Sequence, residues 1–161
     1  MKPVTADLHA CQVRLSGDLL APVVFSVDAL RALPAREVEA TFQCRRTGLR
    51  RHVFVGPLLV EVIRTAGPLF DPGERKDRLR FLIAALGQDG HQAVLSWGEI
   101  DPEFADTHAV LGTRMDGRDL DDEGPYLVVP GDRCGGRHIS QVSEIRVWAA
   151  DHLIHCPAPR A

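Results

Sequence analysis

EGPYLVVPGDRCGGRH, residues 123–138, joins an apolar run to a loop rich in glycine and polar residues. Residues 126–129 are aromatic or aliphatic and lie between Pro125 and Pro130. This pattern predicts a short, fully buried strand, and we expect it to be a central strand. Residues 130–138 then contain three glycines and a dense set of polar side chains. Loops that follow a rigid strand in this way often carry function.

The length and composition predict one soluble globular domain. The 161 residues, 45% of them hydrophobic and 25% charged, suffice for a packed core without disulfides or metals. We expect a single domain over residues 1–150 and a loose tail over 151–161. The formal net charge of −3 gives no reason to expect nucleic acid or an anionic membrane as a partner. The apolar runs are also too short to span a bilayer.

The N-terminal residues lack the apolar segment of a secretory signal. We therefore expect a cytoplasmic protein whose four cysteines, Cys11, Cys44, Cys134 and Cys156, are free thiols.

Short strands outnumber helices along the chain. Apolar alternation and turn residues predict strands at residues 11–15, 22–25, 37–44, 52–55, 79–86, 92–97, 109–111, 126–129 and 139–148. Helices are predicted at 27–33 and 57–66, and a helical turn at 100–104. Long helical crossovers between neighbouring strands are scarce. The pattern therefore favours an α+β fold with mixed or mostly antiparallel sheets and a few short helices.

Individual residues set several of these boundaries. Ser26 is placed to cap the first helix, and Pro57 is expected as the first residue of the second. Asp89-Gly90 predicts a tight hairpin turn. Alternation over residues 37–44 predicts a half-buried strand with Cys44 facing inward at its end.

The order of these motifs resembles the sulfite oxidase-type molybdopterin-binding domain. FSVDALRALP (25–34), TFQC (41–44), VGPLLVEVIRTAG (55–67), TRMDGRDL (113–120) and the closing segment over 124–147 carry the resemblance, which extends from about Leu15 to Val147. It implies the fold of that family and an oxidoreductase that transfers oxygen atoms or electrons. It also implies that Cys44 ligates molybdenum, and that Arg45, Arg46, Arg137 and His138 hold the cofactor and an anionic substrate.

Two features depart from the family pattern. The family follows its Arg-His pair with a Val-Lys-Trp step whose lysine binds the pterin, whereas this chain has Ile139-Ser140-Gln141. The residues before Leu15 do not match the N-terminal family segment that supplies further cofactor ligands. We therefore expect part of the cofactor cradle to be absent.

The chemistry of the residues leaves alternatives open. Neighbouring arginines favour the thiolate form of Cys44, yet a cysteine at a strand end also packs as an ordinary buried residue. Asp132, Arg133, Arg137 and His138 lie on a loop whose amides can face an anion, although Asp132 can equally cap its own turn. The basic residues 45–52 can line a pocket or form a solvated hairpin tip.

Three hypotheses follow. The first is a molybdopterin-dependent oxidoreductase with Cys44 as metal ligand and Arg45, Arg46, Arg133 and Arg137 as cofactor-binding residues. The second is the same scaffold without metal, as a small-molecule-binding protein or a cofactor-free enzyme in which Cys44, His138 or Asp132 acts as acid, base or nucleophile. The third is a structural domain without a site. We further predict that Cys44, Arg137 and His138 line one cavity, and that the protein carries little or no molybdenum.

Unless an anionic cofactor fills this site, its arginines must pair with acids such as Asp132 or turn to solvent, because like charges repel one another where water is excluded.

Overall fold

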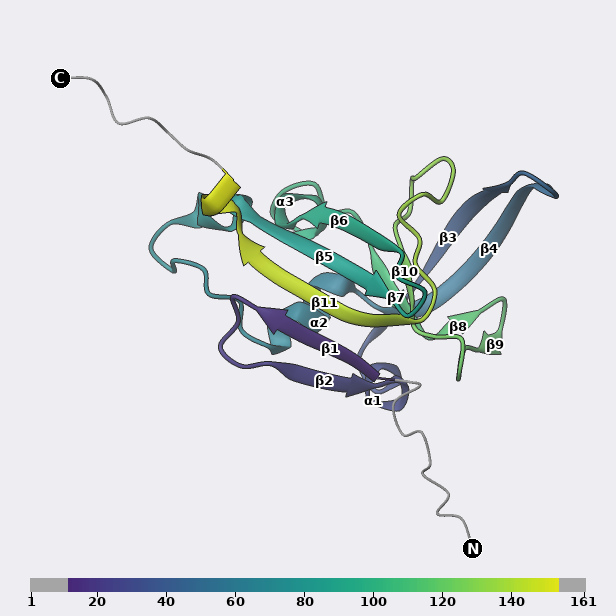
Figure 1. Ribbon diagram of the computed structural model, residues 1–161, viewed down its shortest axis with the longest axis horizontal. Helices are drawn as coiled ribbons and strands as arrows, with labels where there is room; N and C mark the ends of the chain where they lie inside the picture. The colour runs from purple at the N-terminus through teal and green to yellow at the C-terminus, as the bar shows by residue number, and fades with distance from the viewer. Residues whose placement is uncertain (1–11, 154–161) are drawn as a thin grey trace, which may run out of the picture.

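A computed structural model describes residues 12–153, and the side chain of Cys44 lies outside what it describes. Within residues 12–153, eleven strands form three sheets, with a few short helices between them (Figure 1). The strands are β1 Gln12–Gly17, β2 Val23–Ser26, β3 Ala35–Cys44, β4 Gly48–Pro57, β5 Phe81–Gly87, β6 Gln92–Ser96, β7 Val110–Gly112, β8 Arg114–Met115, β9 Arg118–Asp119, β10 Tyr126–Val128 and β11 Val142–Ala149. The α-helices are α1 Val27–Arg31, α2 Leu59–Thr65 and α3 Trp97–Ile100, and the 3-10 helices are η1 Arg75–Arg80 and η2 Ala150–Leu153.

The largest sheet has five strands in the order β2-β1-β11-β5-β6. β1 and β11 are parallel, and the other neighbours in this sheet are antiparallel. The other sheets have the orders β3-β4-β8-β9 and β10-β7, and their pairs are antiparallel. These sheets confirm the predicted α+β class with mixed and mostly antiparallel pairing.

The main core lies between the five-stranded sheet and α2. Alternate residues of β1, β5 and β11 face this core together with the apolar side of α2; among them are Val13, Leu15, Ile83, Ile145, Val147, Leu59, Val62 and Ile63, all without solvent exposure. A smaller cluster joins the β3–β4 hairpin to β7 and β10 through Val38, Ala40, Phe54, Val110, Leu120 and Val128. This second cluster fixes the hairpin against the strand that precedes the polar loop.

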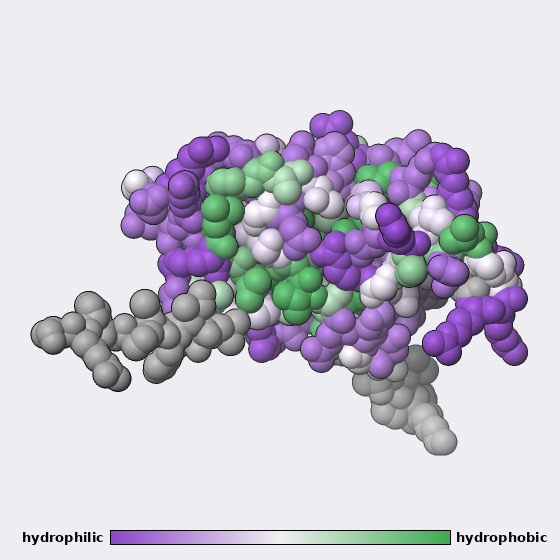
Figure 2. Space-filling view, turned by 90° about the horizontal axis from the view of Figure 1, so that it is seen from above, coloured by the Kyte–Doolittle hydropathy of each residue, from purple (hydrophilic) through white to green (hydrophobic). Residues whose placement is uncertain are grey.

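The β3–β4 hairpin extends beyond the five-stranded sheet, and the loop between β10 and β11 projects on the same side (Figure 1). Seen from above, the molecule shows a hydrophobic area left of the centre of the view and a smaller one at the right-hand end, with hydrophilic residues around both (Figure 2). Within the described residues, no helix is long and apolar enough to cross a membrane.

Several local predictions are confirmed. The Ser26 side chain accepts a hydrogen bond of 3.1 Å from the Ala29 backbone N–H, so it caps α1. Asp89-Gly90 forms the turn between β5 and β6, where Gly90 has a φ of 85°. Val38 and Ala40 are buried on one face of β3, as the alternation predicted.

Other local predictions are wrong. Pro57 does not begin a helix, because it pairs with Ala35 at the end of β4, and α2 begins at Leu59. The buried run at 126–129 is not a central strand: β10 pairs with β7 in a two-stranded sheet, and β11 occupies the middle of the five-stranded sheet. The helical turn expected at 100–104 begins earlier, because α3 starts at Trp97.

Candidate functional site

The loop at residues 130–138 is closed at its base by backbone hydrogen bonds. The Leu127 N–H donates to the Ile139 carbonyl at 2.8 Å, and the Ile139 N–H donates to the Leu127 carbonyl at 3.1 Å. The His138 N–H also donates to the Gly135 carbonyl at 3.0 Å. The last residues of the loop are therefore held by β10, whereas Arg133, Cys134 and Gly136 are exposed.

His138 lies beneath this loop and against the β3–β4 hairpin. Only 7% of its surface is exposed, and its ring centroid lies 4.3 Å from that of Phe42 on β3. Gly135 has a φ of 62°, and a Cβ atom there would lie 2.6 Å from Phe42 Cδ1 and 2.7 Å from His138 Cδ2. The loop backbone therefore packs directly onto both rings, and a larger residue than glycine does not fit.

Neither ring nitrogen of His138 makes a hydrogen bond of normal geometry with the described residues. Burial lowers the pKa of His138 below its usual value, and the nearby Asp132 carboxylate and Leu127 backbone oppose this shift only in part. The imidazole is therefore neutral at pH 7, with one nitrogen able to donate a proton and the other able to accept one.

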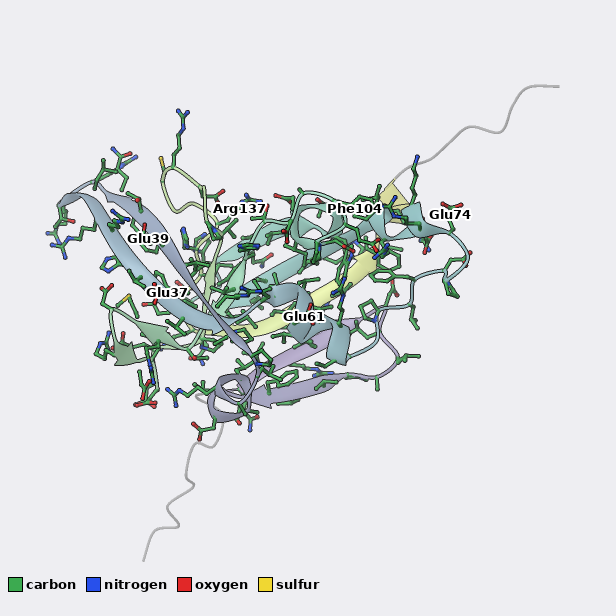
Figure 3. All side chains as sticks on the ribbon, turned by 180° about the vertical axis from the view of Figure 1, so that it is seen from behind. Glu37, Glu39, Glu61, Glu74, Phe104 and Arg137 are labelled. Atoms are coloured by element: carbon green, nitrogen blue, oxygen red, sulfur yellow. The ribbon has the colours of Figure 1, made fainter. Side chains whose placement is uncertain are left out.

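Arg137 connects the loop to α3 (Figure 3). Its Nε and Nη2 donate to the two carboxylate oxygens of Asp132 at 2.9 and 2.8 Å, and its Nη1 donates to Glu99 Oε1 at 2.6 Å. Glu99 Oε2 accepts the Ser96 backbone N–H at 2.7 Å and so completes the capping box of α3. One guanidinium therefore donates hydrogen bonds to two carboxylates. The trio of Asp132, Arg137 and Glu99 has a formal charge of −1.

These contacts shift the titration of both acids. The hydrogen bond from Arg137 lowers the pKa of Asp132 below its usual value. Burial alone would raise the pKa of Glu99, but the hydrogen bonds from Arg137 and from the Ser96 backbone reverse this effect and lower it. Both carboxylates are therefore ionised at neutral pH, and they hold Arg137 in place.

A second histidine, His52, also contacts Phe42. The His52 and Phe42 ring centroids are 5.5 Å apart, and His52 Nδ1 lies 2.7 Å from Asp116 Oδ2. The Val53 backbone N–H donates to the other oxygen of Asp116, and this bond, followed by the contact with His52, lowers the pKa of Asp116. Phe42 thus contacts two imidazoles. That of His52 has a carboxylate partner, whereas the nitrogens of His138 have no hydrogen-bond partner of normal geometry among the described residues.

The remaining predicted site residues lie at the hairpin tip and the loop tip. Cys44 ends β3 opposite Gly48, two residues from Phe42. Arg45, Arg46 and Arg133 are exposed and form no ion pair within the described part of the chain. Three predictions concern the side chain of Cys44: that it faces inward, that it ligates a metal, and that it shares a cavity with Arg137 and His138. Because this side chain lies outside the described residues, all three stay predictions.

The structure brings three predicted residues together, namely Asp132, Arg137 and His138. Glu99 and Phe42 also belong to this site, and neither was predicted as a site residue from the sequence. Ser96 and Glu99 fit the Ser-x-x-Glu capping-box pattern, which could have placed the start of α3. Nothing in the sequence links Glu99 to Arg137, which lies 38 residues away. Of the expected free thiols, Cys134 is free and exposed, whereas Cys11, Cys156 and most of the predicted tail lie outside the described residues.

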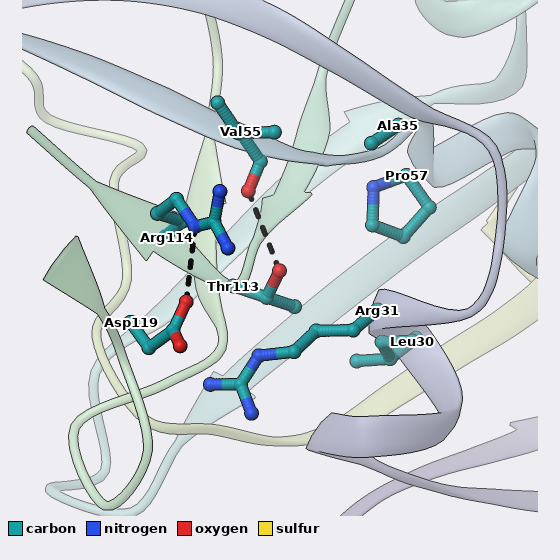
Figure 4. Close-up of a pocket in the computed structure, with 8 residues that line it drawn as sticks. All are labelled: Leu30, Arg31, Ala35, Val55, Pro57, Thr113, Arg114 and Asp119. Carbon is teal, nitrogen blue, oxygen red and sulfur yellow. Dashed lines mark hydrogen bonds and ion pairs between the residues drawn. The ribbon is translucent and has the colours of Figure 1, made fainter. Parts of the chain in front are cut away.

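A separate cavity of about 170 Å³ lies between α1, β4 and β8 (Figure 4). Its lining residues are Leu30, Arg31, Ala35, Val55, Pro57, Thr113, Arg114 and Asp119. Arg114 pairs with Asp119 at 2.9 Å, and Arg31 pairs with Asp28 and Asp121 at 2.9 and 2.6 Å. The arginines of this cavity are therefore neutralised by neighbouring acids, unlike those at the two tips.

The residues at the predicted site fit molybdopterin poorly. Arg137 is already bound by two carboxylates, and the resulting trio is negative where a phosphate would need positive donors. His138 is covered by Phe42 and Gly135. The arginines that remain unpaired are exposed to solvent rather than gathered around the imidazole. Among the described residues, no group of three or more His, Cys, Asp or Glu side chains is placed to hold a metal ion.

Comparison with solved structures supports the fold. The chain is similar to the sulfane dehydrogenase SoxCD from Paracoccus pantotrophus, with a TM-score of 0.68 and 17% sequence identity over 87% of this chain. The matched region covers 38% of that protein's chain. The chain therefore has a fold similar to that of this sulfane dehydrogenase, which supports the predicted sulfite oxidase-like fold. No protein-family profile matches the sequence, and no curated protein matches it either.

Proposed function

We propose that this protein uses a sulfite oxidase-like fold without molybdopterin, to bind an uncharged organic small molecule beside His138. The observation that carries the proposal is the pairing of Arg137 with both Asp132 and Glu99. Arg137 is the residue that the family resemblance assigns to the anionic cofactor. Because its charge is already matched, the neighbourhood of His138 is suited to an uncharged ligand rather than to a phosphate.

The buried imidazole of His138 favours ligand binding. A buried polar group without a hydrogen-bond partner costs about 1–3 kcal/mol, which a ligand that bonds to it recovers. His138 has two such nitrogens. The Phe42 ring, 4.3 Å away, offers an aromatic face for the apolar part of the same ligand. A flat molecule with one donor and one acceptor therefore matches this site.

The ligand reaches His138 only if the loop moves. The imidazole is 7% exposed, and Gly135 covers it. Gly131 and Gly135 both have positive φ values, and Arg133, Cys134 and Gly136 are exposed. Residues 131–136 therefore form the part that opens. Once bound, a ligand with an acidic proton meets a neutral His138 as proton acceptor, and the Asp132 carboxylate favours the imidazolium that forms.

A screen of small aromatic heterocycles by thermal shift and calorimetry tests this proposal. We expect compounds with a neighbouring donor and acceptor to raise the melting temperature of the wild type, and His138→Phe to abolish the effect. Arg133→Gln is the matched control, since it alters an exposed residue of the same loop, and we expect it to bind as the wild type does. Binding of the same compounds at full strength by His138→Phe would refute the site.

A molybdopterin-dependent oxidoreductase is the second candidate. The fold match and the position of Cys44 before the unpaired Arg45 and Arg46 favour it. In that case Cys44 ligates molybdenum and the cofactor supplies oxygen-atom or electron transfer. Its signature is the fluorescence of an oxidised pterin, released in a one-to-one ratio when the purified protein is denatured. The absence of this signal from protein made in a host that synthesises the cofactor excludes this candidate.

A further inference from the structure

Two projecting segments of the molecule meet at one end and carry a group of arginines. The tip of the β3–β4 hairpin and the loop 130–138 extend on the same side of the body (Figure 1), and Cys134 Sγ lies 3.7 Å from Gln43 Oε1. This surface, here called the basic tip, is defined by Arg45, Arg46, Leu49, Arg50 and Arg133. All five side chains are exposed.

The arginines of the basic tip differ from most others in having no carboxylate partner among residues 12–153. Of the sixteen arginines in the described residues, ten form an ion pair with an acid. Four of the other six lie at the basic tip, and the remaining two, Arg14 and Arg36, lie on β1 and at the start of β3. Unpaired positive charge is therefore concentrated where the molecule projects farthest from its body.

The charge of the rest of the chain restricts what can bind there. The whole chain has a formal net charge of −3 that includes the four positive charges of the basic tip, so the remaining residues carry a formal −7. An extended polyanion such as nucleic acid contacts a wide surface and would meet repulsion beyond the tip. A short acidic segment contacts the tip alone, so the charge distribution favours the segment.

The shape and composition of the tip also fit a protein partner. Small ligands prefer concave sites, whereas these side chains stand on two exposed turns. Leu49 is 68% exposed and precedes Arg50 in the chain, so an apolar contact is available among the charges. Arginine is enriched at protein interfaces, because its planar group binds carboxylates through two parallel hydrogen bonds.

We infer that the basic tip is a docking surface for an acidic segment of a partner protein. The segment pairs its carboxylates with arginines from both turns and places an apolar side chain against Leu49. The surface does not include His138, Asp132 or Arg137. The inference is therefore independent of the proposed small-molecule site, and either can fail without the other.

The test uses fluorescence anisotropy with a labelled peptide that alternates glutamate with serine and has a central leucine. The two variants compared are Arg45→Gln/Arg46→Gln at the tip and Arg14→Gln/Arg36→Gln elsewhere. Both remove two unpaired, exposed arginines and leave the same net charge. We expect the tip variant to bind the peptide about fivefold more weakly than wild type or worse, as the loss of two exposed ion pairs implies, and the control to change less than about twofold. Circular dichroism checks that both variants are folded.

Three results would overturn the inference. Equal weakening in the tip and control variants would mean that net charge alone attracts the peptide. Tighter binding of a single-stranded oligonucleotide of equal charge, lost in the tip variant, would make the surface one for nucleic acid. Absence of peptide binding to the wild type at low ionic strength would show that the tip docks no acidic segment.

Discussion

Arg137→Met tests the ionic trio on which the site assignment depends. The substitution keeps most of the apolar stem but removes the group that donates to both oxygens of Asp132 and to Glu99. Two ionised carboxylates then remain near each other without their common partner. We expect the variant to fold, because α3 keeps its Ser96–Glu99 capping box.

The magnitude follows from the exposure of the three side chains. Arg137, Glu99 and Asp132 are 34%, 35% and 20% exposed, so water screens the interaction in part. Exposed ion pairs contribute about 0.2–1 kcal/mol, and removal of one partner from a buried pair costs about 3–5 kcal/mol. We expect a loss between these limits, about 2 kcal/mol in the free energy of unfolding at pH 7. For a chain of this length, the melting temperature then falls by roughly 4–8 °C.

Chemical denaturation of wild type and variants measures this loss, with Arg133→Met as the control. Arg133 lies on the same loop but is exposed and unpaired, so we expect its variant to differ from wild type by less than about 0.5 kcal/mol. The double variant Arg137→Met/Asp132→Asn should recover part of the loss, because one unpartnered carboxylate is gone.

The loss of stability in Arg137→Met must also depend on pH. The pKa values of Asp132 and Glu99 are lowered in the folded protein, so their pairing contributes stability above the unfolded pKa values, near 4. This contribution is lost as the pH falls through the folded values. The difference between wild type and Arg137→Met should therefore shrink at strongly acidic pH. A loss below about 0.5 kcal/mol at pH 7, equal to that of Arg133→Met, would refute the trio as the reason that Arg137 cannot hold a cofactor.

Two further outcomes are expected. Burial lowers the pKa of His138, so as the pH falls the unfolded chain takes up a proton near pH 6.5, before the folded protein does. Between pH 7 and pH 5 the free energy of unfolding should therefore fall in the wild type, and fall less in His138→Phe. An equal fall in both proteins, measured by denaturant titration at each pH, would contradict a buried neutral imidazole. Asp101 is fully buried and accepts hydrogen bonds from Trp97 Nε1 at 2.7 Å and Arg78 Nη1 at 3.0 Å. Asp101→Leu should therefore lower the free energy of unfolding, measured by chemical denaturation, by about 3–5 kcal/mol, whereas Glu103→Gln at an exposed position should lower it by less than about 1 kcal/mol. Similar losses in both variants would contradict this network.

The sequence predicted those parts of the fold that depend on local patterns. The Ser26 cap, the Asp89-Gly90 turn and the alternation of β3 follow from the chemistry of neighbouring residues. Pro57 was misplaced because its missing N–H suits the first turn of a helix and the end of an edge pairing equally well. The sequence alone does not distinguish these positions.

The errors at the centre of the fold have a nonlocal cause. A fully buried apolar run predicts burial but not its neighbours, so β10 was expected in the middle of a large sheet. Parallel pairing of β1 with β11, about 130 residues apart in the chain, instead places β11 there. In the same way, the stacking of Phe42 on His138 and the bond from Arg137 to Glu99 join segments that no local pattern connects.

Molybdenum analysis of the intact protein tests the central claim most directly. The wild type and Cys44→Ala are produced in a host that synthesises the molybdenum cofactor, purified without chelators and analysed by inductively coupled plasma mass spectrometry. If Arg137 is committed to its two acids and the site serves an uncharged organic ligand, the wild type contains far less than one molybdenum per chain and matches Cys44→Ala. One molybdenum per wild-type chain, lost in Cys44→Ala, would contradict the account and establish the oxidoreductase.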